Sequence, residues 1–376
     1  MSRFLILDGQ TDQGRRIAPN VLAGDAFRNT VLKVLMITTN WPSPGRPRTS
    51  HFIKRQADFL QAAGVDVDVF HFNGRKNPWR YAKAWLAVRR KLRSTQYDLI
   101  HAQFGQSGLM ALPKRLPYVV TLRGSDILGI VSDQDGRQTL AGEMNRSLSR
   151  FVASKADAVI MVSAHMASHL GPTRSTFVIP SGIDFGLFQT MPRDQARAQL
   201  GLPADERLVL FVGNPEQKRK RLALAQAAVA ILNRRLPARL IVAWGTPHTD
   251  IPKYMCAADA LVFTSMQEGS PNVVKEALAC DLPVVSVAVG DVEHRIGRVE
   301  GCELCRDETP EAIADSLEKV LRRSARVAGR VSVEHLCESA ITEQVISVYR
   351  SVLASKTVSE APDATPDRAF LGARSG

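Results

Sequence analysis

The feature that most constrains the fold is a series of short apolar runs, rich in valine and isoleucine, with helical stretches between them. These runs begin near residues 33, 65, 98, 117, 158 and 176, and a second series begins near residues 207, 238, 259 and 283. Strand-like runs that alternate with helices of about ten or more residues indicate parallel sheets built from βαβ units. We therefore predict an α/β protein with two Rossmann-like domains.

Domain boundaries follow from the composition between these runs. Residues 183–202 are rich in proline, glycine and aspartate, which predicts the inter-domain connection. We expect an N-terminal extension over 1–32, a first domain over 33–182, a second domain over 183–355 and a flexible tail over 356–376. Whether the last helix crosses back to the first domain stays open. Binding motifs should follow the runs directly, because open α/β sheets bind ligands outside the carboxyl ends of their strands.

Length and composition exclude several classes of protein. A chain of 376 residues with 45% hydrophobic content can bury two cores. No run of about 18 apolar residues could span a bilayer, and Asp8 and Asp12 interrupt the start of the chain, so we expect no signal peptide. The five cysteines are odd in number and sparse, which is typical of a reducing compartment. These features predict a cytoplasmic protein.

The positive charge is confined to the first half of the chain. Up to Thr190 there are 25 basic and 13 acidic residues, and after it there are 24 of each, so the net charge of +12 lies entirely before residue 191. A basic half beside a neutral half suggests that one domain faces something anionic. A phospholipid surface, a phosphorylated acceptor and nucleic acid all fit.

The segment EGSPNVVKEA, residues 268–277, carries the strongest candidate site. Ser270 is a good N-cap and Pro271 a good first helical residue, so we predict a helix from there to about Cys280. The free amides and positive dipole at its start would favour a diphosphate or a sugar oxygen. Glu268 precedes the helix, and Glu276 lies about one and a half turns into it. The alternative is that Glu268 only caps the helix and Glu276 only faces solvent.

The longer stretch EGSPNVVKEALACDLPVV resembles the E-x7-E signature of family 4 glycosyltransferases. This resemblance implies the GT-B architecture, with the two Rossmann-like domains facing each other across a cleft, and a sugar transfer that retains the anomeric configuration. It implies that Glu268 contacts the hydroxyls of the donor sugar and that Glu276 takes the ribose hydroxyls of the nucleotide. It also implies that the backbone between them holds the sugar, at Gly269, Ser270, Pro271 and Asn272.

Two further segments resemble this family. FVGNPEQKRKRLALAQAA, residues 211–228, resembles the strand and loop whose basic residues neutralise the donor diphosphate, which implies a donor-binding role for Gly213, Asn214, Lys220 and Arg219 or Arg221. Taken alone, the KRKR run fits a solvated basic loop equally well. NWPSPGRPRTSHFIKRQADFL, residues 40–60, resembles the loop and helix beside the acceptor, with Ser50 where relatives have glycine.

TLRGSD, residues 121–126, resembles the T-x-H-G-S-D segment near the transferred sugar. Arg123 stands where histidine is more usual, so a catalytic histidine is not carried over, although an arginine could stabilise the departing phosphate. The resemblance implies that Arg123 and Asp126 act with Glu268 in catalysis. It places Gly124 and Ser125 on the acceptor side, together with Ser50.

Two possible metal sites are weaker. Asp66 and Asp68 resemble a D-x-D metal motif, but they alternate within an apolar run and so share one face of a strand. Cys302 and Cys305 would need a second ligand pair, such as His335 and Cys337, to hold zinc. We expect no metal and no cofactor apart from the nucleotide-sugar substrate, linked to UDP, GDP or ADP.

The helix expected at residues 78–94 has an apolar stripe and a basic side. The stripe is Tyr81, Trp85, Val88 and Leu92, and the basic side includes Arg80, Lys83, Arg90 and Lys91. The helix either packs on its sheet or lies on anionic lipid, with Trp79 and Trp85 near the headgroups and Arg89, Arg90, Lys91 and Arg93 on anionic phosphate. The pattern alone leaves both readings open.

The leading hypothesis is a glycosyltransferase acting on a growing surface polysaccharide or a lipid-linked oligosaccharide, peripheral on the inner face of the cell membrane. The alternative within enzymes is a nucleotide-sugar epimerase of the same architecture, which would need no acceptor. A basic nucleic-acid-binding protein would explain the charge, but the sequence contains no recognisable recognition motif.

Overall fold

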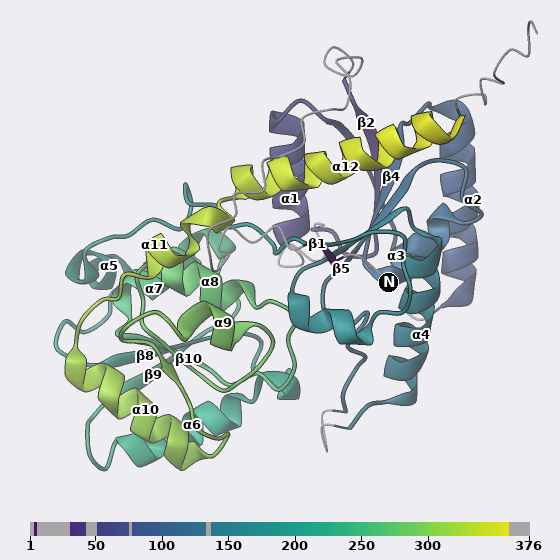
Figure 1. Cartoon of the computed structure of the whole chain (residues 1–376). Helices are drawn as coiled ribbons and strands as arrows, with labels where there is room; N and C mark the ends of the chain where they lie inside the picture. Colours follow the sequence, from purple (N-terminus) through teal and green to yellow (C-terminus); the bar gives the residue numbers. More distant parts are fainter. Residues whose placement is uncertain (1–3, 6–30, 43–50, 75–76, 133–136, 361–376) are drawn as a thin grey trace, which may run out of the picture.

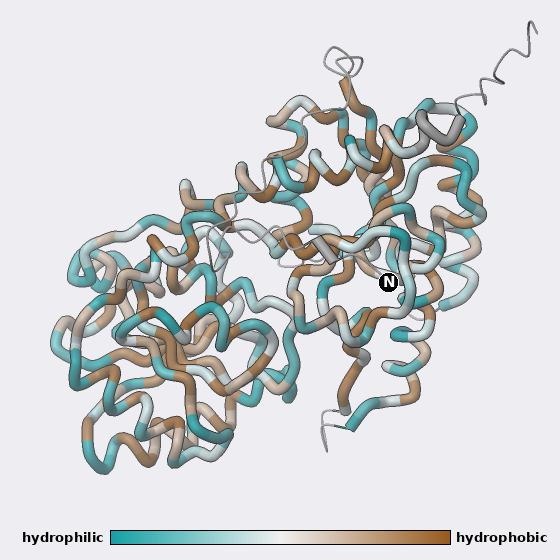
Figure 2. Tube along the Cα trace, in the orientation of Figure 1, coloured by the Kyte–Doolittle hydropathy of each residue, from teal (hydrophilic) through white to brown (hydrophobic). Residues whose placement is uncertain are grey.

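The computed structural model describes residues 4–5, 31–42, 51–74, 77–132 and 137–360. Two parallel sheets lie side by side in the molecule, each packed between helices (Figure 1). The hydrophobic residues follow the strands through the middle of each domain (Figure 2). The predicted α/β class with two Rossmann-like domains is confirmed.

In the described part of the chain, the first sheet has seven strands in the order β1-β7-β6-β5-β4-β2-β3. They are β1 (Phe4–Leu5), β2 (Lys33–Thr38), β3 (Asp66–His71), β4 (Leu99–Gln103), β5 (Tyr118–Leu122), β6 (Ala158–Met161) and β7 (Thr176–Val178). All six apolar runs of the first series form strands. The expectation that the first strand begins near Lys33 is wrong, because β1 pairs with β7 at the sheet edge. Four helices accompany this sheet: α1 (His51–Ala62), α2 (Pro78–Ser94), α3 (Gly105–Gly108) and α4 (Leu140–Lys155).

The second sheet has the order β12-β11-β10-β8-β9. Its strands are β8 (Leu208–Val212), β9 (Arg239–Ala243), β10 (Ala260–Phe263), β11 (Val284–Ser286) and β12 (Glu303–Leu304). The four runs of the second series match β8 to β11, and only the two-residue β12 has no counterpart among them. The helices of this domain are α5 (Arg193–Leu200), α6 (Leu222–Leu232), α7 (Ile251–Ala257), α8 (Asn272–Ala279), α9 (Val292–Ile296), α10 (Pro310–Arg323) and α11 (Gly329–Val333).

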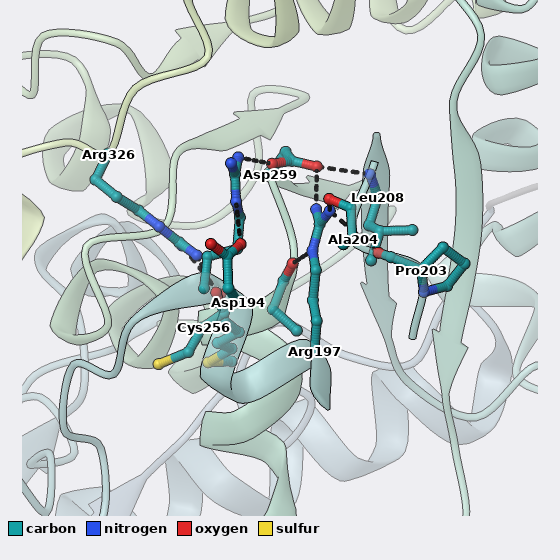
Figure 3. A network of polar contacts seen from close by, with 11 residues as sticks. Asp194, Arg197, Pro203, Ala204, Leu208, Cys256, Asp259 and Arg326 are labelled. Atoms are coloured by element: carbon teal, nitrogen blue, oxygen red, sulfur yellow. Dashed lines mark hydrogen bonds and ion pairs between the residues drawn. The ribbon is translucent and has the colours of Figure 1, made fainter. Parts of the chain in front are cut away.

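The connection predicted over residues 183–202 is shorter than expected, because α5 belongs to the second domain. Arg197 on α5 is buried and donates at 2.8 Å to Asp259, the residue directly before β10. The same carboxylate accepts from the amide of Leu208 at 2.7 Å. Figure 3 shows these three residues in one polar network. The network attaches α5 to two strands of the second sheet.

The last helix, α12 (Glu338–Glu360), returns to the first domain. It packs on α1 and lies across the edge of the first domain (Figure 1). Tyr349 on this helix forms a hydrogen bond with His101 on β4, with 2.6 Å between Oη and Nδ1. The helix continues to Glu360, so residues 356–360 are helical where a flexible tail was expected, and the rest of that segment lies outside the described residues.

The chain passes between the domains at two adjacent places. The first passage is at Ile183 and the second at Cys337, and these residues form a parallel β-bridge. The amide of Ile183 donates to the carbonyl of Leu336 at 2.8 Å, and the amide of Glu338 donates to the carbonyl of Ile183 at 2.9 Å. The two passages therefore run side by side.

Buried charges surround these passages in what we call the hinge cluster: Arg55, Ser181, Gly182, Lys275 and Glu338. Arg55 on α1 donates to Glu338 at 2.9 Å and to the carbonyl of Gly182 at 2.7 Å. Lys275 on α8 donates to the carbonyl of Ser181 at 2.8 Å, and burial lowers its pKa to about 7. Burial raises the pKa of Glu338, although the charge of Arg55 acts in the opposite direction. Arg55 from the first domain and Lys275 from the second therefore both bind carbonyls of the short segment 181–182.

Helix α2 has the predicted bounds and packs on its sheet. Its stripe joins the core of the first domain, and Trp85 donates from its indole nitrogen to the carbonyl of Leu112 at 2.7 Å. Arg89 is buried and donates to the carbonyls of Met110, Leu112 and Pro113. The reading that places Trp85 and Arg89 at lipid headgroups is therefore wrong.

Candidate active site

A cavity of about 630 Å³ lies between the two domains, within the range of ligand pockets. Both domains line it, along loops that follow the carboxyl ends of their strands. It brings together most of the residues expected at the site: Arg123, Gly124, Ser125, Gly213, Arg219, Lys220, Glu268, Gly269, Ser270, Pro271, Asn272 and Glu276. Asn214 and Asp126 lie outside the lining, and Ser50 lies outside the described residues.

Glu268 holds two cations of the loop that follows β8. Lys220, at the end of the short 3-10 helix Lys218–Lys220, donates to Glu268 Oε1 at 2.6 Å. Arg219 donates to the same oxygen at 3.2 Å. Burial raises the pKa of Glu268, but the charges of Lys220 and Arg219 outweigh it and hold the pKa below its usual value. The carboxylate is thus ionised, with two cations available to an anionic ligand.

Glu276 faces two histidines that the sequence analysis did not single out. His248, which follows β9, lies with Nε2 3.5 Å from Glu276 Oε1. His51, the first residue of α1, stacks on His248 with ring centroids 4.9 Å apart. Burial raises the pKa of Glu276, while the hydrogen bond and charge of His248 lower it to a net value below the usual one. Burial lowers the pKa of His51. His248 could have been identified as a candidate site residue from the sequence, because it follows a predicted strand.

Helix α8 begins one residue later than predicted. Its N-cap is Pro271, and no side chain caps the helix. Ser270, the predicted cap, donates instead to Asp291 at 2.8 Å. The first amides of α8 are therefore not covered by a capping side chain, and they remain suited to an anionic or hydroxyl-bearing ligand.

The two domains touch through glycines beside the cavity. A Cβ atom on Gly269 would lie 2.4 Å from the carbonyl oxygen of Arg123, across the cleft. On the other side of the same loop, Gly290 has φ +61°, and a Cβ there would lie 3.0 Å from the carbonyl oxygen of Glu268. Only residues without a side chain allow this backbone approach.

Arg123 is tied down by its neighbours in the first domain. Its guanidinium donates to Gln56, Gln103 and Ser181 at 2.7 to 3.1 Å. It also lies over the ring of Phe52, 4.9 Å from the centroid. Burial lowers the pKa of Arg123 to about 10, although the charge of Asp126 acts in the opposite direction. The group remains a cation held in one orientation at the cavity wall.

Asp126 shapes the loop that carries Arg123. Its carboxylate accepts hydrogen bonds from the backbone amides of Arg123, Gly124 and Ile127 at 2.8 to 3.1 Å. It is buried, and burial raises its pKa while these amides act in the opposite direction. The geometry gives Asp126 contacts with the backbone of the loop rather than with the cavity.

Residues of the two possible metal sites make contacts with other parts of the protein. Asp66 pairs with Lys33 at 3.0 Å, and Asp68 pairs with Lys91 at 2.8 Å. Cys302 accepts from the amide of Val284. Within the described ranges, no three His, Cys, Asp or Glu side chains are grouped so that they could hold a metal ion.

Comparisons with known proteins give consistent matches for both domains. A family model described as a glycosyl transferase 4-like domain matches residues 25–182, and one described as glycosyl transferases group 1 matches residues 206–323. The putative teichuronic acid biosynthesis glycosyltransferase TuaC of Bacillus subtilis (strain 168) is 26% identical over 76% of this chain and 88% of its own length.

Two solved structures share the fold. Sucrose-phosphate synthase from Thermosynechococcus elongatus has a TM-score of 0.70 at 21% identity, covering 87% of this chain and 100% of that chain. HepE of Anabaena, solved in complex with UDP and glucose, has a TM-score of 0.60 at 19% identity, covering 85% of this chain and 100% of that chain.

Proposed function

Because the chain belongs to the glycosyltransferases that combine these two domains in the GT-B architecture, we propose that it transfers a sugar from a nucleotide sugar to a saccharide acceptor. The two family matches confirm the resemblance to family 4 glycosyltransferases and the assignment as an enzyme. The observation that supports the donor most strongly is the cavity itself, in which Glu268 and Glu276 lie on either side of the start of α8.

In this proposal each part of the donor meets a different part of the cavity. Glu276 accepts hydrogen bonds from the ribose hydroxyls, displacing His248, which lies 3.5 Å away. Lys220 and Arg219 turn from Glu268 to the diphosphate, and the amides at the start of α8 add to the positive field. Glu268 then accepts from the hydroxyls of the sugar. Arg123 supplies a fixed positive charge for the departing phosphate.

The acceptor in this proposal is a growing surface polysaccharide or a lipid-linked oligosaccharide. The name of the relative TuaC, which refers to teichuronic acid biosynthesis, supports a polysaccharide. The excess of basic residues before residue 191 supports an acceptor attached to an anionic group or surface. We further propose retention of the anomeric configuration and a location on the inner face of the cell membrane. The epimerase alternative finds no support in the relatives.

No helix in the described part of the chain combines the length and the apolar character needed to cross a membrane.

Replacing Glu276 with alanine should weaken nucleotide binding, both for the nucleoside diphosphate and for the nucleotide sugar. Losing hydrogen bonds to a charged acceptor should lower the affinity about 10- to 100-fold. Calorimetric titration with UDP, GDP and ADP, and with UDP-glucose, would measure the loss. The matched control is Glu300→Ala, because Glu300 has an 86% exposed side chain and lies outside the cavity. An unchanged affinity for every nucleotide that the unmodified protein binds would contradict the ribose assignment.

Activity should survive chelation of divalent metals. Lys220, Arg219 and the start of α8 supply the positive charge that a metal ion supplies in other sites. Sugar transfer measured with and without EDTA checks this, with a metal-dependent glycosyltransferase assayed alongside to prove that the chelator works. Complete loss of transfer, restored by manganese or magnesium, would show the proposal of metal independence to be wrong.

A further inference from the structure

Helix α4 exposes a row of large apolar side chains. Leu140 is 85% exposed, Met144 is 73% exposed, Leu148 is half-buried and Phe151 is 49% exposed. Their spacing of four, four and three residues places them on one face of the helix, which we call the α4 stripe. The opposite face, which includes Asn145, Ser149 and Val152, is buried against the first domain. The stripe is therefore an outward face of a well-packed helix.

Cations accompany the α4 stripe. The helix carries Arg146, Arg150 and Lys155 against a single carboxylate, Glu143, and that carboxylate is paired with Arg146 at 2.5 Å. Lys155 lies beside the stripe itself, with Nζ 5.6 Å from the ring centroid of Phe151. Arg150 flanks the stripe and donates to the carbonyl of His169 at 2.7 Å. Apolar side chains with cations beside them are typical of helices that lie in the interface of an anionic membrane.

The α4 stripe begins at the rim of the cavity. Ile130 and Val131 line the cavity, and Ile130 is 39% exposed. Thr139, directly before α4, donates from its amide and its hydroxyl to the carbonyl of Ile130, both at 2.9 Å. A Cβ atom on Gly142 would lie 2.3 Å from the amide nitrogen of Ile130, so the first turn of α4 packs directly on the rim. The rim and the stripe are thus in direct contact.

Helix α2, the other candidate for a membrane contact, differs from α4 in its position relative to the cavity. Trp85 and Arg89 are bound to carbonyls of the first domain, and the exposed apolar residues of α2 are Trp79 and Leu86. These two residues share a face with Lys83 and Arg90, at spacings of four, three and four residues, but no residue of α2 lines the cavity. In Figure 1, α4 lies on the side of the first domain that α12 leaves uncovered.

We propose that the α4 stripe, with Ile130, rests on an anionic phospholipid bilayer, so that the cavity rim faces the membrane surface. This surface deepens the proposed function, because a lipid-linked acceptor would then reach the cavity at Ile130 and Val131 without leaving the bilayer. The partner is identified by its chemistry: an apolar interior below a layer of negative headgroups.

Sedimentation with vesicles tests this surface. The full chain should bind vesicles of equal parts phosphatidylglycerol and phosphatidylcholine at low salt, bind pure phosphatidylcholine vesicles at least about tenfold more weakly, and dissociate as salt shortens the range of the charges. The variant Leu140→Ser, Met144→Ser and Phe151→Ser should lose at least about tenfold in binding. The matched control, Trp79→Ser on α2, should bind like the unmodified protein.

Three outcomes would overturn the proposal: no binding of the unmodified protein to anionic vesicles, equal binding by the triple variant, or loss of binding in Trp79→Ser alone. Self-association that disappears in the triple variant, without vesicle binding, would assign the stripe to a protein contact instead. The triple variant should keep its thermal midpoint and its affinity for nucleotide, since the three side chains are exposed and lie outside the cavity. Failure of vesicle binding with intact nucleotide binding therefore contradicts the docking surface and leaves the proposed function standing.

Discussion

Replacing Glu268 with glutamine should lower the turnover of the nucleotide sugar about 100- to 1000-fold, the range seen when one group that stabilises a transition state is removed. The affinity for the bare nucleoside diphosphate should stay the same or rise. In the ligand-free protein Glu268 binds Lys220 and Arg219, so the neutral amide would leave both cations free for the diphosphate. Steady-state kinetics with the nucleotide sugar and titration with the nucleoside diphosphate would measure the two effects separately.

A matched control lies in the same basic loop. Glu308 pairs with Arg221, the residue after Lys220, but its side chain is half exposed and lies outside the cavity. Glu308→Gln should leave turnover and affinity nearly unchanged, because exposed ion pairs contribute little. If Glu268→Gln lowered the affinity for the nucleoside diphosphate as strongly as it lowered turnover, the assignment of Glu268 to the sugar would be contradicted.

Removing either partner of the buried ion pair in the hinge cluster should destabilise the protein by about 3 to 5 kcal/mol, because the remaining charge stays buried without its partner. Arg55 and Glu338 are 9% and 2% exposed at their side chains, and Arg55→Met also leaves the carbonyl of Gly182 without its donor. Urea unfolding, followed by circular dichroism, would measure the loss. The double variant Arg55→Met and Glu338→Met should recover most of it, since no unpaired charge remains.

The neighbouring residue on the same helix provides the comparison. Lys54 pairs with Asp58 in an exposed contact, so Lys54→Met should change the free energy of unfolding by less than about 1 kcal/mol. Equal small effects of Arg55→Met and Lys54→Met would mean that the hinge cluster does not support the fold. A double variant as unstable as the worse single variant would mean that packing, rather than charge, explains the loss.

The strands and the two glutamates were accessible to sequence analysis because their signals are local. A buried parallel strand is a short apolar run, and the E-x7-E pattern lies within one loop and one helix. The partners of these elements were not accessible. Arg55 and Glu338 are 283 positions apart, and only the return of α12 to α1 brings them together. His51 and His248 likewise come from different domains and meet only when the cleft is formed.

Competition between contacts explains the local errors. Ser270 has the residue type of an N-cap, but Asp291 takes its hydroxyl, so the cap is lost. Arg89 counts as polar in a helical pattern, yet three backbone carbonyls satisfy its guanidinium inside the protein. On α4, small and polar residues such as Gly142 and Ser149 face the domain, while Leu140 and Met144 face outward. Pattern alone assigns the apolar residues to the core, because it cannot show how close the neighbouring backbone approaches.

The two adjacent passages at Ile183 and Cys337 have a consequence for how the cleft can move. In terms of connectivity the second domain is an insert, because the chain leaves the first domain at Ile183 and re-enters it at Glu338. An insert held by two hydrogen-bonded segments can turn about the line through them, but sliding or twisting would break the pairing of Ile183 with Leu336 and Glu338. Turning about this line would change the distance between Glu276 and the cavity wall that carries Arg123, which lie on opposite sides of the cleft.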